Sequence, residues 1–512
     1  METDSKKRVF VSSQGMIVMC KSEIAFQPTR RQILAAIVSA GLIASSRPAI
    51  ASQTDEYKTK TFRARAVIKL NGEVHLKSQM SESTDAKGRT AIARRAPFQS
   101  NVTLDYEENS QFDNGLIDCT SLINVVEASS DIQVDRHLTK TKLREECNEI
   151  VRFSRTSKRM LTSGLNAPMF TAEVNLIELP INSTFLDEIV TKKQVKVTEK
   201  WTLSDDLTTR LLSLDTVRDG ELIACLVEAD NEVAQIEVKG KVNGVVSGIR
   251  TTIEVDGKAQ LDRKAGEITW FAANVEEERE ISERAPGYKV LAQVQIRKKQ
   301  IDALSSGESL ETIANRIPSI ESASIRQFHS DLGHFRFIAD SKWVTFRDNG
   351  EEAIYRFIVD NARIAQCIVT NMVDFEPGRQ LSMDGFVADV KTSLAGSSAQ
   401  IRESSEKVTG SKMRAIRVES HGRVKDVDVL WIHYHISNDD GRRAVLAFML
   451  NADDAEVFGA EDSQIVDAFE LINWPKKLDS QALEQEIAKS EKDKAAETKA
   501  DATTSSVLKI SR

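Results

Sequence analysis

The stretch FRARAVIKL at residues 62–70 alternates apolar with polar side chains and decides our prediction of the fold. Successive side chains of a β-strand point to opposite faces of a sheet, so this stretch predicts a strand with one buried and one solvated face. Asn71 and Gly72 follow it. An Asn-Gly pair between alternating stretches predicts a tight turn, here into a second strand at residues 74–76.

The same alternation recurs up to residue 299, in AQIEVKG (234–240), GIRTTIEV (248–255) and QVQIR (293–297). The Asp-Gly pair at 256–257 predicts another turn between two strands. One helix interrupts the strands. It begins at Ser204, and its apolar side is formed by Leu207, Leu211, Leu212 and Leu214. We therefore predict a β-rich domain over residues 52–300 in which one helix covers a face or an end of the sheet.

The pattern changes after residue 300. Residues 301–324 contain Ser-Ser-Gly, a proline and scattered charges, which predicts a linker with a short helix. Residues 325–475 combine short strands, a hairpin turn at 438–441, a helix over 381–394 and a closing helix over 462–469. This is an α+β pattern, and α+β is the fold class that we predict for the chain. Residues 476–512 are rich in charged and small residues, which predicts a disordered, charged tail.

The N-terminus contains a predicted export signal. Arg30 and Arg31 precede the apolar stretch ILAAIVSAGLIA (33–44), and residues 49–51 fit a cleavage site of small residues, so residues 1–51 form a predicted signal peptide. The apolar stretch is shorter than the about 20 residues that span a bilayer, and we predict no transmembrane anchor. The arginine pair also fits the twin-arginine route, so two export routes stay open. The expected location is extracytoplasmic, either periplasmic or secreted.

The net charge of the chain argues against one class of partner, nucleic acid. The formal net charge is -8, and residues 1–51 carry seven basic and three acidic residues, so the mature chain has a net charge of -12. We expect no binding of nucleic acid through general electrostatic attraction.

Four cysteines follow the predicted cleavage site, and no two of them form a CxxC motif. Cys119 and Cys147 either pair in an oxidising compartment or stay separate as buried thiols.

Several segments of the second half occur in the order of a known family. They are Trp343, Ile364 with Ala365, the helix at 381–394, WIHYH (431–435), DGRR (440–443), LAF (446–448) and AFE (468–470). On these segments, residues 325–475 resemble the PsbP-like fold family. The resemblance implies an antiparallel sheet flanked by helices and a non-catalytic role in binding or assembly. Residues 58–299 are similar in organisation to uncharacterised exported proteins of planctomycete-type bacteria, through EKW (199–201), residues 240–248 and PG (286–287), and this similarity implies no activity.

His433 and His435 are the candidate metal ligands. In a strand over residues 431–435, Trp431 and both histidines share one face. Two histidines at positions i and i+2 can bind one metal ion if a carboxylate or a third histidine approaches from a neighbouring strand, and Asp426 and Asp428 are near in sequence. The other interpretation is a pair of hydrogen-bonded or half-exposed histidines of a sheet.

No stretch of the sequence has the specificity of a catalytic motif, and no Gly-x-Ser-x-Gly motif is present. We predict an exported, non-catalytic binding or assembly protein of the cell envelope, with no cofactor and with an unknown protein or envelope ligand as its partner. Two alternatives stay open. One is an exported hydrolase or metal-dependent enzyme that uses His433 and His435. The other is a carrier of a lipid or another hydrophobic ligand, which predicts an apolar cavity between sheet and helix.

Overall fold

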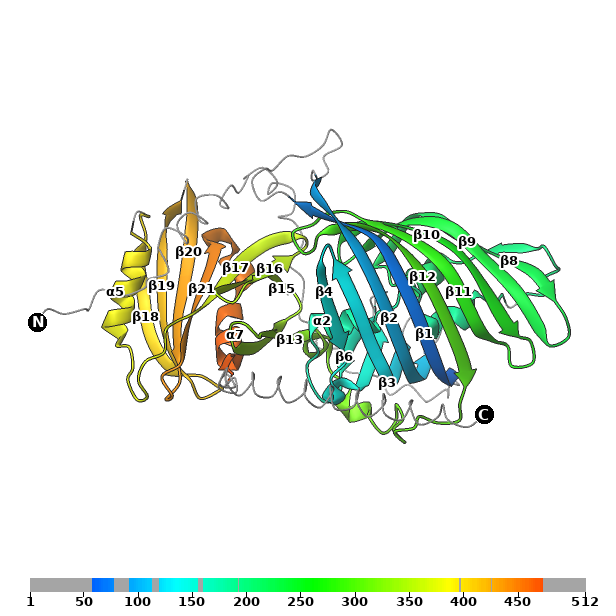
Figure 1. The fold of residues 1–512 in the computed structure, drawn as a ribbon, viewed down its shortest axis with the longest axis horizontal. Helices are drawn as coiled ribbons and strands as arrows, with labels where there is room; N and C mark the ends of the chain where they lie inside the picture. Colours follow the sequence, from blue (N-terminus) through cyan, green and yellow to red (C-terminus); the bar gives the residue numbers. More distant parts are fainter. Residues whose placement is uncertain are drawn as a thin grey trace, which may run out of the picture.

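The computed structural model describes residues 58–77, 92–112, 119–154, 160–191, 193–395, 397–424 and 426–472. In these ranges the strands form three sheets, of twelve, three and seven strands (Figure 1). Of the described residues, 57% are in strands and 15% in helices, so the predicted α+β class is wrong and the fold is mostly β. The prediction failed because it did not account for the lengths of the elements: strands extend to 21 residues, whereas no described helix exceeds 11. The predicted signal peptide (1–51) and tail (476–512) lie outside the described residues.

The largest sheet contains strands β1 to β12, and neighbouring strands pair antiparallel. In the order of pairing they are β6 (Leu161–Gly164), β5 (Glu149–Ser154), β3 (Cys119–Val134), β2 (Ile92–Phe112), β1 (Lys58–Lys77), β12 (Gly287–Gln300), β11 (Glu267–Arg279), β10 (Ile249–Asp262), β9 (Val233–Val246), β8 (Thr216–Ala229) and β7 (Lys200–Thr202), with β4 (His137–Lys142) beside β3. On β1, Phe62, Ala64, Ala66 and Ile68 are buried and the residues between them are exposed, as the alternation predicts.

Two predicted turns in this sheet are wrong. Strand β1 continues through residues 71–72, and β10 continues through residues 256–257. Gly72 lies opposite Val290 of β12, where a Cβ atom would come within 2.1 Å of the carbonyl oxygen of Lys289. The glycine therefore permits a close approach of the neighbouring backbone and does not form a turn.

Three short helices cover the buried face of this sheet, which bends around them (Figure 1). We call them the inner helices: α2 (Thr171–Ile177), the 3₁₀ helix η3 (Ser183–Ile189) and α3 (Asp205–Leu211). Helix α3 is the predicted packing helix, and the Ser204 side chain caps it by accepting a hydrogen bond from the amide of Leu207. The inner helices and the sheet share one apolar core, to which the helices contribute Val174, Leu176, Ile177, Phe185, Leu186, Ile189, Leu207 and Leu211.

The second half of the chain forms the two smaller sheets. The seven-stranded sheet pairs in the order β15 (Trp343–Asp348), β16 (Glu352–Val359), β17 (Ala362–Asn371), β21 (Arg443–Asn451), β20 (Val427–Ser437), β19 (Arg414–Val424) and β18 (Gln400–Val408). The three-stranded sheet contains β13 (Ile325–Ser330), β14 (Phe335–Asp340) and β22 (Glu470–Leu471). The predicted turn at 438–441 joins β20 to β21.

The helices of this half are short and lie on both faces of the seven-stranded sheet. Helix α5 (Met383–Ser393) contacts β18 and β19. Helices α6 (Ala455–Phe458) and α7 (Glu461–Ala468) pack on the opposite face together with the three-stranded sheet. Helices α5 and α7 occupy the places of the two predicted helices. They are too short to make this half a balanced α+β fold, so the predicted sheet with flanking helices is corrected to a β-rich arrangement.

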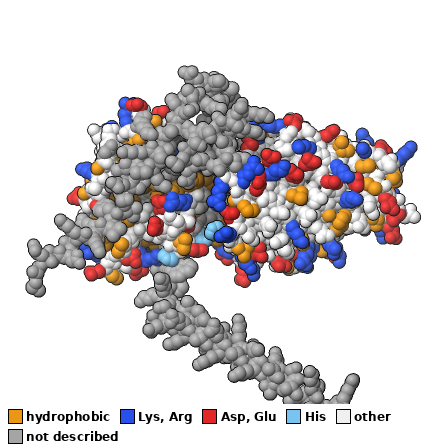
Figure 2. Space-filling model, turned by 45° about the horizontal axis from the view of Figure 1, so that its top comes forward, with side chains coloured by type: hydrophobic (Ala, Val, Ile, Leu, Met, Phe, Trp, Pro, Cys, Tyr) orange, Lys and Arg blue, Asp and Glu red, His pale blue; other side chains and the backbone are white. Residues whose placement is uncertain are grey.

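Over β9 and β10, the face of the twelve-stranded sheet that points away from the inner helices is solvated. Lys239 and Lys241 of β9 form ion pairs with Asp256 and Glu254 of β10, at N–O distances of 3.5 and 3.6 Å. Figure 2 shows basic and acidic side chains interspersed over this part of the molecule.

The predicted linker at 301–324 contains the short helix α4 (Ile320–Ala323). It packs on β3 and β5 through a small apolar cluster of Leu304, Leu310, Ile313, Leu122, Val151 and Phe153.

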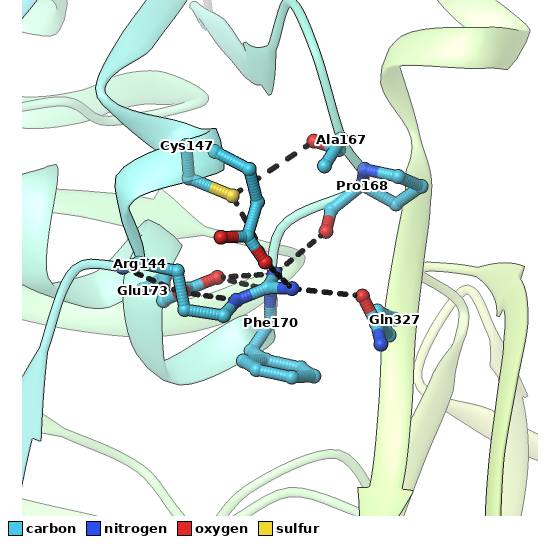
Figure 3. A network of polar contacts seen from close by, with 8 residues as sticks. Arg144, Cys147, Ala167, Pro168, Phe170, Glu173 and Gln327 are labelled. Carbon is cyan, nitrogen blue, oxygen red and sulfur yellow. Dashed lines mark hydrogen bonds and ion pairs between the residues drawn. The ribbon is translucent and has the colours of Figure 1, made fainter.

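Arg144 connects the first sheet to the second half of the chain (Figure 3). Its guanidinium donates to Glu173 of α2, with 2.8 Å between Nε and Oε1, and to Oε1 of Gln327 on β13 at 3.0 Å. The amide of Gln327 donates to the carbonyl oxygen of Met169 at 3.0 Å. Burial alone would raise the pKa of Glu173, but hydrogen bonds from Arg144 and from backbone amides hold it below its usual value. The Arg144–Glu173 ion pair thus joins the segment that follows β4 to α2, and a hydrogen bond from Arg144 adds Gln327 of β13.

Replacement of Arg144 tests this junction. Arg144→Ala is expected to lower the free energy of unfolding by about 1–2 kcal/mol, because buried Glu173 loses its cationic partner but keeps two backbone amide donors. Gln327→Ala removes one neutral partner and is expected to cost about 0.5–1 kcal/mol. Urea unfolding followed by circular dichroism compares the two variants. Equal losses in both would show that Arg144 is not the central residue of the junction.

Candidate functional site

The two histidines predicted as metal ligands lie on one face of β20, beside Trp431. His433 is 2% exposed and His435 is 1% exposed. Asp426 and Asp428 are exposed at the beginning of the strand and do not approach them. Within the described ranges, no hydrogen-bond partner reaches any ring nitrogen of the two histidines, and no group of three His, Cys, Asp or Glu side chains could hold a metal ion. The metal hypothesis therefore lacks a third ligand in this part of the chain.

Both histidines are held in the neutral form. Burial lowers the pKa of His433 to about 4. Burial, together with the nearby guanidinium groups of Arg443 and Arg414, lowers the pKa of His435 to about 4. The ring of Phe386 on α5 packs against His435, with 5.6 Å between ring centroids. At neutral pH the pair therefore behaves as two uncharged side chains in an apolar layer, and it becomes sensitive to acid.

A second group of polar side chains lies between the twelve-stranded sheet and the inner helices. Its members come from β2, β3, β5, η3 and α3, and each is less than a tenth exposed. We call it the inner polar cluster, and it consists of Tyr106, Glu108, Ser110, Cys119, Ser121, Arg152, Ser154, Ser183, Thr184 and Arg210. The spacing of two residues along β2 and the pairing of Ser110 with Ser121, and of Ser121 with Arg152, bring its sheet members to one face.

Glu108 accepts hydrogen bonds from both the sheet and η3. Its Oε1 atom accepts from the hydroxyl of Thr184 at 2.7 Å and from that of Ser110 at 2.6 Å. Its Oε2 atom has no hydrogen-bond partner among the residues that the structure describes. The hydroxyls of Tyr106 and Ser183 are hydrogen-bonded to each other, and burial raises the pKa of Tyr106, so the phenol is neutral. Helix η3 thus supplies one hydrogen-bond partner to each of two polar side chains of β2, Tyr106 and Glu108.

Two arginines give the inner polar cluster a positive charge. Arg152 of β5 donates from Nη2 to the carbonyl oxygen of Ile177, at the end of α2, over 2.5 Å. Its Nε atom has no hydrogen-bond partner in the described part of the chain. Arg210 of α3 donates from Nη1 to the hydroxyl of Ser154 at 3.4 Å. Since Glu108 is the one carboxylate among the ten members, the cluster has a formal net charge of +1.

A buried group of ion pairs fixes η3 to the sheet next to this cluster. The Oδ2 atom of Asp187 lies 3.0 Å from Nζ of Lys60 on β1 and 2.6 Å from Nζ of Lys298 on β12. Its Oδ1 atom accepts from the amide of Ile268 on β11 at 2.9 Å. Burial alone would raise the pKa of Asp187, but the ammonium groups of Lys298 and Lys60 hold it below its usual value. Helix η3 is therefore connected by polar groups to β1, β2, β11 and β12.

The described cysteines provide no activated nucleophile. Cys119, Cys147, Cys225 and Cys367 are free, so Cys119 and Cys147 are separate thiols. Burial raises the pKa of both to about 12, which keeps them protonated and unreactive at neutral pH. Cys119, within electrostatic reach of Glu108, Arg152 and Arg210, is thus a neutral member of the inner polar cluster.

No sequence motif identifies the inner polar cluster, because its members come from five separate segments. One local signal exists in YEENS (106–110). The period of two places Glu108 and Ser110 on the same face as the buried Leu104 and Tyr106. Charged or hydroxyl side chains at core-facing positions of a strand are unusual, and they indicate a buried polar site.

In the described part of the chain, no helix combines the length and the apolar character needed to cross a membrane. No protein-family model matches the sequence. No curated protein matches it either.

Comparison with solved structures gives only partial similarities. The chain is similar to CyanoP, the cyanobacterial PsbP of Synechocystis sp. PCC 6803, with 12% identity and a TM-score of 0.24 over 30% of this chain and 96% of that one. It is similar to the Ran-binding protein Mog1p of Saccharomyces cerevisiae, with 9% identity and a TM-score of 0.22 over 29% and 96% of the two chains. Lipovitellin is similar with 6% identity and a TM-score of 0.25, over 49% of this chain and 26% of that one. A PsbP-like fold in one segment is the most that these similarities support.

Proposed function

We propose that this chain is a non-catalytic, extracytoplasmic binding protein whose twelve-stranded sheet holds one hydrophobic ligand beneath the inner helices. The location follows from the predicted signal peptide. The ligand follows from one observation, which is that short helices cover a broad apolar sheet face and are tied to it through polar groups.

The buried face of the sheet is chemically suited to an apolar chain. Its central strands carry small apolar side chains, among them Ala64 and Ala66 on β1, Ala273 on β11 and Ala292 on β12. An acyl chain can lie close to such small side chains once the inner helices have moved away, and each CH₂ group of a ligand that is buried there contributes about 0.8 kcal/mol. A ligand with an acyl chain can therefore replace the apolar contacts that the inner helices make with this face.

The inner helices can separate from the sheet at a modest cost. None of them exceeds seven residues, and helices of this length depend on packing for their stability. Water can replace the polar partners of Asp187, Glu108 and Arg152 when these groups become exposed, so the net loss per hydrogen bond is small. If the helices contacted the sheet through apolar side chains alone, water could not replace the lost contacts in this way. Because the contact between the inner helices and the sheet is partly polar and partly apolar, it favours inner helices that can move away from the sheet and return.

Titration with the fluorescent probe 1-N-phenylnaphthylamine, which becomes bright in apolar surroundings, tests this function. We expect saturable binding of one probe per chain. Ala66→Trp places a large side chain on the buried face and is expected to weaken binding about tenfold, because overpacking of a filled site is unfavourable. Val67→Trp adds the same side chain on the exposed face of the same strand, and it is expected to have no effect.

A second matched pair of variants on β12 repeats the comparison, so that the test still works if one variant of the first pair does not fold. Ala292→Phe changes the buried face, and Leu291→Phe changes the exposed face. Circular dichroism verifies that each variant is folded. Absence of saturable binding, or equal effects of the inward and outward substitutions, would refute the proposed function.

A further inference from the structure

The twelve-stranded sheet supplies a binding site for a carboxylate, and the side chain of Asp187 on η3 occupies it. Oδ2 of Asp187 lies 3.0 Å from Nζ of Lys60 on β1 and 2.6 Å from Nζ of Lys298 on β12. Its Oδ1 atom accepts from the amide of Ile268 on β11 at 2.9 Å. We call the two ammonium groups and this amide the carboxylate site. All three donors belong to the sheet, whereas the carboxylate that they bind belongs to an inner helix.

Both lysines are held on the sheet by contacts that do not involve η3. Nζ of Lys298 lies 4.4 Å from the ring centroid of Phe62 on β1, and Nζ of Lys60 lies 5.6 Å from that of Phe112 on β2. Such contacts attract a cation to the face of the ring. Both carboxylates that pair with Lys60 belong to η3 and leave with it. When the inner helices separate from the sheet, the lysines stay behind without these carboxylates.

The other charges on this face do not neutralise the two lysines. Among the described residues of the sheet, the other buried charged side chains that face the inner helices are Arg152 and Glu108, which are opposite in sign. Arg210 belongs to α3 and leaves with the inner helices. The sheet therefore retains three positive charges and one negative charge, a formal net charge of +2, and this charge favours an anion over a cation.

The carboxylate site lies at one end of the small apolar side chains on the buried face. Lys298 pairs with Ala64 of β1, and Ala66 follows on the same face. Ala292 lies further along β12, at a distance of roughly 20 Å from Lys298 for an extended strand. A ligand whose head lies in the carboxylate site can therefore extend its tail over these alanines.

Resting on the proposed function, we propose that the ligand is a long-chain carboxylic acid whose carboxylate binds in the carboxylate site in place of Asp187. The bound group defines this chemistry, because the three donors already hold two carboxylate oxygens from inside the chain. Hydrogen bonds between ammonium and carboxylate groups are about twice as strong as neutral ones. Asp187 is thus an internal substitute for the head group, and it closes the site when no ligand is bound.

Ligands with one tail and different heads test this inference by displacement of 1-N-phenylnaphthylamine. The set consists of dodecanoate, dodecyl phosphate, dodecan-1-ol and dodecyltrimethylammonium. Since the tail is the same, the cost of moving the inner helices cancels in the comparison. Dodecanoate is expected to bind about tenfold more tightly than dodecan-1-ol. Dodecyl phosphate is expected to bind less tightly than dodecanoate, because its head is larger than the carboxylate that the site holds. Dodecyltrimethylammonium is expected to bind least.

Variants of β12 assign the preference to the carboxylate site. Lys298→Met is expected to reduce the tenfold preference for dodecanoate over dodecan-1-ol to about threefold or less, because one of two ammonium donors is lost. Lys299→Met changes the next residue, which is exposed on the other face, and is the matched control that keeps the whole preference. Lys60→Met repeats the test on β1 and keeps the inference testable if Lys298→Met does not fold.

Asp187→Ala tests the carboxylate site without any movement of the inner helices. The substitution removes the internal carboxylate, so that acetate can bind in its place. Sodium acetate is expected to raise the midpoint of thermal unfolding of Asp187→Ala by a few degrees relative to sodium chloride at the same ionic strength, since a ligand that binds only the folded chain stabilises it. The unmodified chain and the double variant Asp187→Ala/Lys298→Met are expected to show no such difference.

The outcomes separate this inference from the proposed function. If dodecan-1-ol binds as tightly as dodecanoate, or if Lys298→Met and Lys299→Met keep the same preference, the head-group site is refuted and the hydrophobic ligand remains. Tighter binding of dodecyl phosphate than of dodecanoate would overturn the carboxylic acid. A folded Asp187→Ala that acetate does not stabilise would refute the carboxylate site itself. If no dodecyl compound binds although acetate stabilises Asp187→Ala, the proposed function fails, and the ligand inferred from it fails as well.

Discussion

Asp187→Ala is expected to lower the free energy of unfolding by about 3–5 kcal/mol, because the buried ammonium group of Lys298 loses its carboxylate partner and that of Lys60 keeps only Glu188. The side chains of Lys60 and Lys298 are 7% and 2% exposed, so water does not replace the lost partner in the folded state. Lys298 also lies 4.4 Å from the ring centroid of Phe62, which compensates only part of the loss. Urea unfolding at neutral pH, followed by circular dichroism, measures the change.

Two further variants show whether the ion pairs cause this loss. Glu188 lies 3.2 Å from Lys60 but is more exposed, so Glu188→Ala is expected to cost less than about 1 kcal/mol. Replacing Lys60, Lys298 and Asp187 together by Met, Met and Leu removes the three most buried charges at once, leaves the more exposed Glu188, and is expected to restore most of the stability. A loss below about 1 kcal/mol for Asp187→Ala would contradict the ion-pair explanation.

The same group predicts a dependence on acid. The pKa of Asp187 is lowered in the folded state from its usual value of 3.8. Its contribution to stability is therefore complete above the unfolded pKa and is lost as the pH falls through the lower, folded pKa. This loss occurs below the pH range in which the histidines titrate.

Protonation of His433 and His435 is expected to remove up to about 3 kcal/mol of stability for each histidine as the pH falls. Their pKa in the folded chain is about 4, against an ordinary value of 6.5. Between these values the unfolded chain binds more protons than the folded chain, so stability rises with pH in this interval and is constant above it. The two histidines thus make the seven-stranded sheet sensitive to mild acid, at a higher pH than Asp187.

Replacement of both histidines by phenylalanine is expected to remove this pH dependence. Urea unfolding at about pH 7 and at about pH 4.5 gives the difference in stability for each protein. His137→Phe is the matched control, since His137 is exposed on β4 and its removal is expected to leave the pH dependence unchanged. The same loss of stability in acid for the double variant and the unmodified chain would contradict the role of the buried pair.

Alternation predicted which residues of the first sheet are buried, but it did not predict the length of the strands. The faces of residues 62–68 are as expected, since the period of two is a local property. Whether β1 ends at residues 71–72 depends on partners that are distant in sequence. Gly72 pairs with Val290 on one side and with Phe98 on the other, and these long-range pairs outweigh the local turn preference.

The inner helices and the inner polar cluster could be predicted only in part for the same reason. Helix α3 has a clear cap and a leucine-rich side, so its existence and its place on the sheet were predictable. Helix η3 has no such period, and its place is fixed by contacts with residues more than 75 positions away, such as Glu108 and Lys298. The site therefore consists of residues that no local pattern groups together.

The proposed ligand on the buried face of the twelve-stranded sheet is tested most directly by native mass spectrometry of the intact chain after incubation with a bacterial phospholipid extract. We expect one added lipid mass per chain, which is lost in Ala66→Trp and kept in Val67→Trp. A spectrum of the chain with no lipid adduct, or an adduct that both variants keep equally, would contradict ligand binding beneath the inner helices.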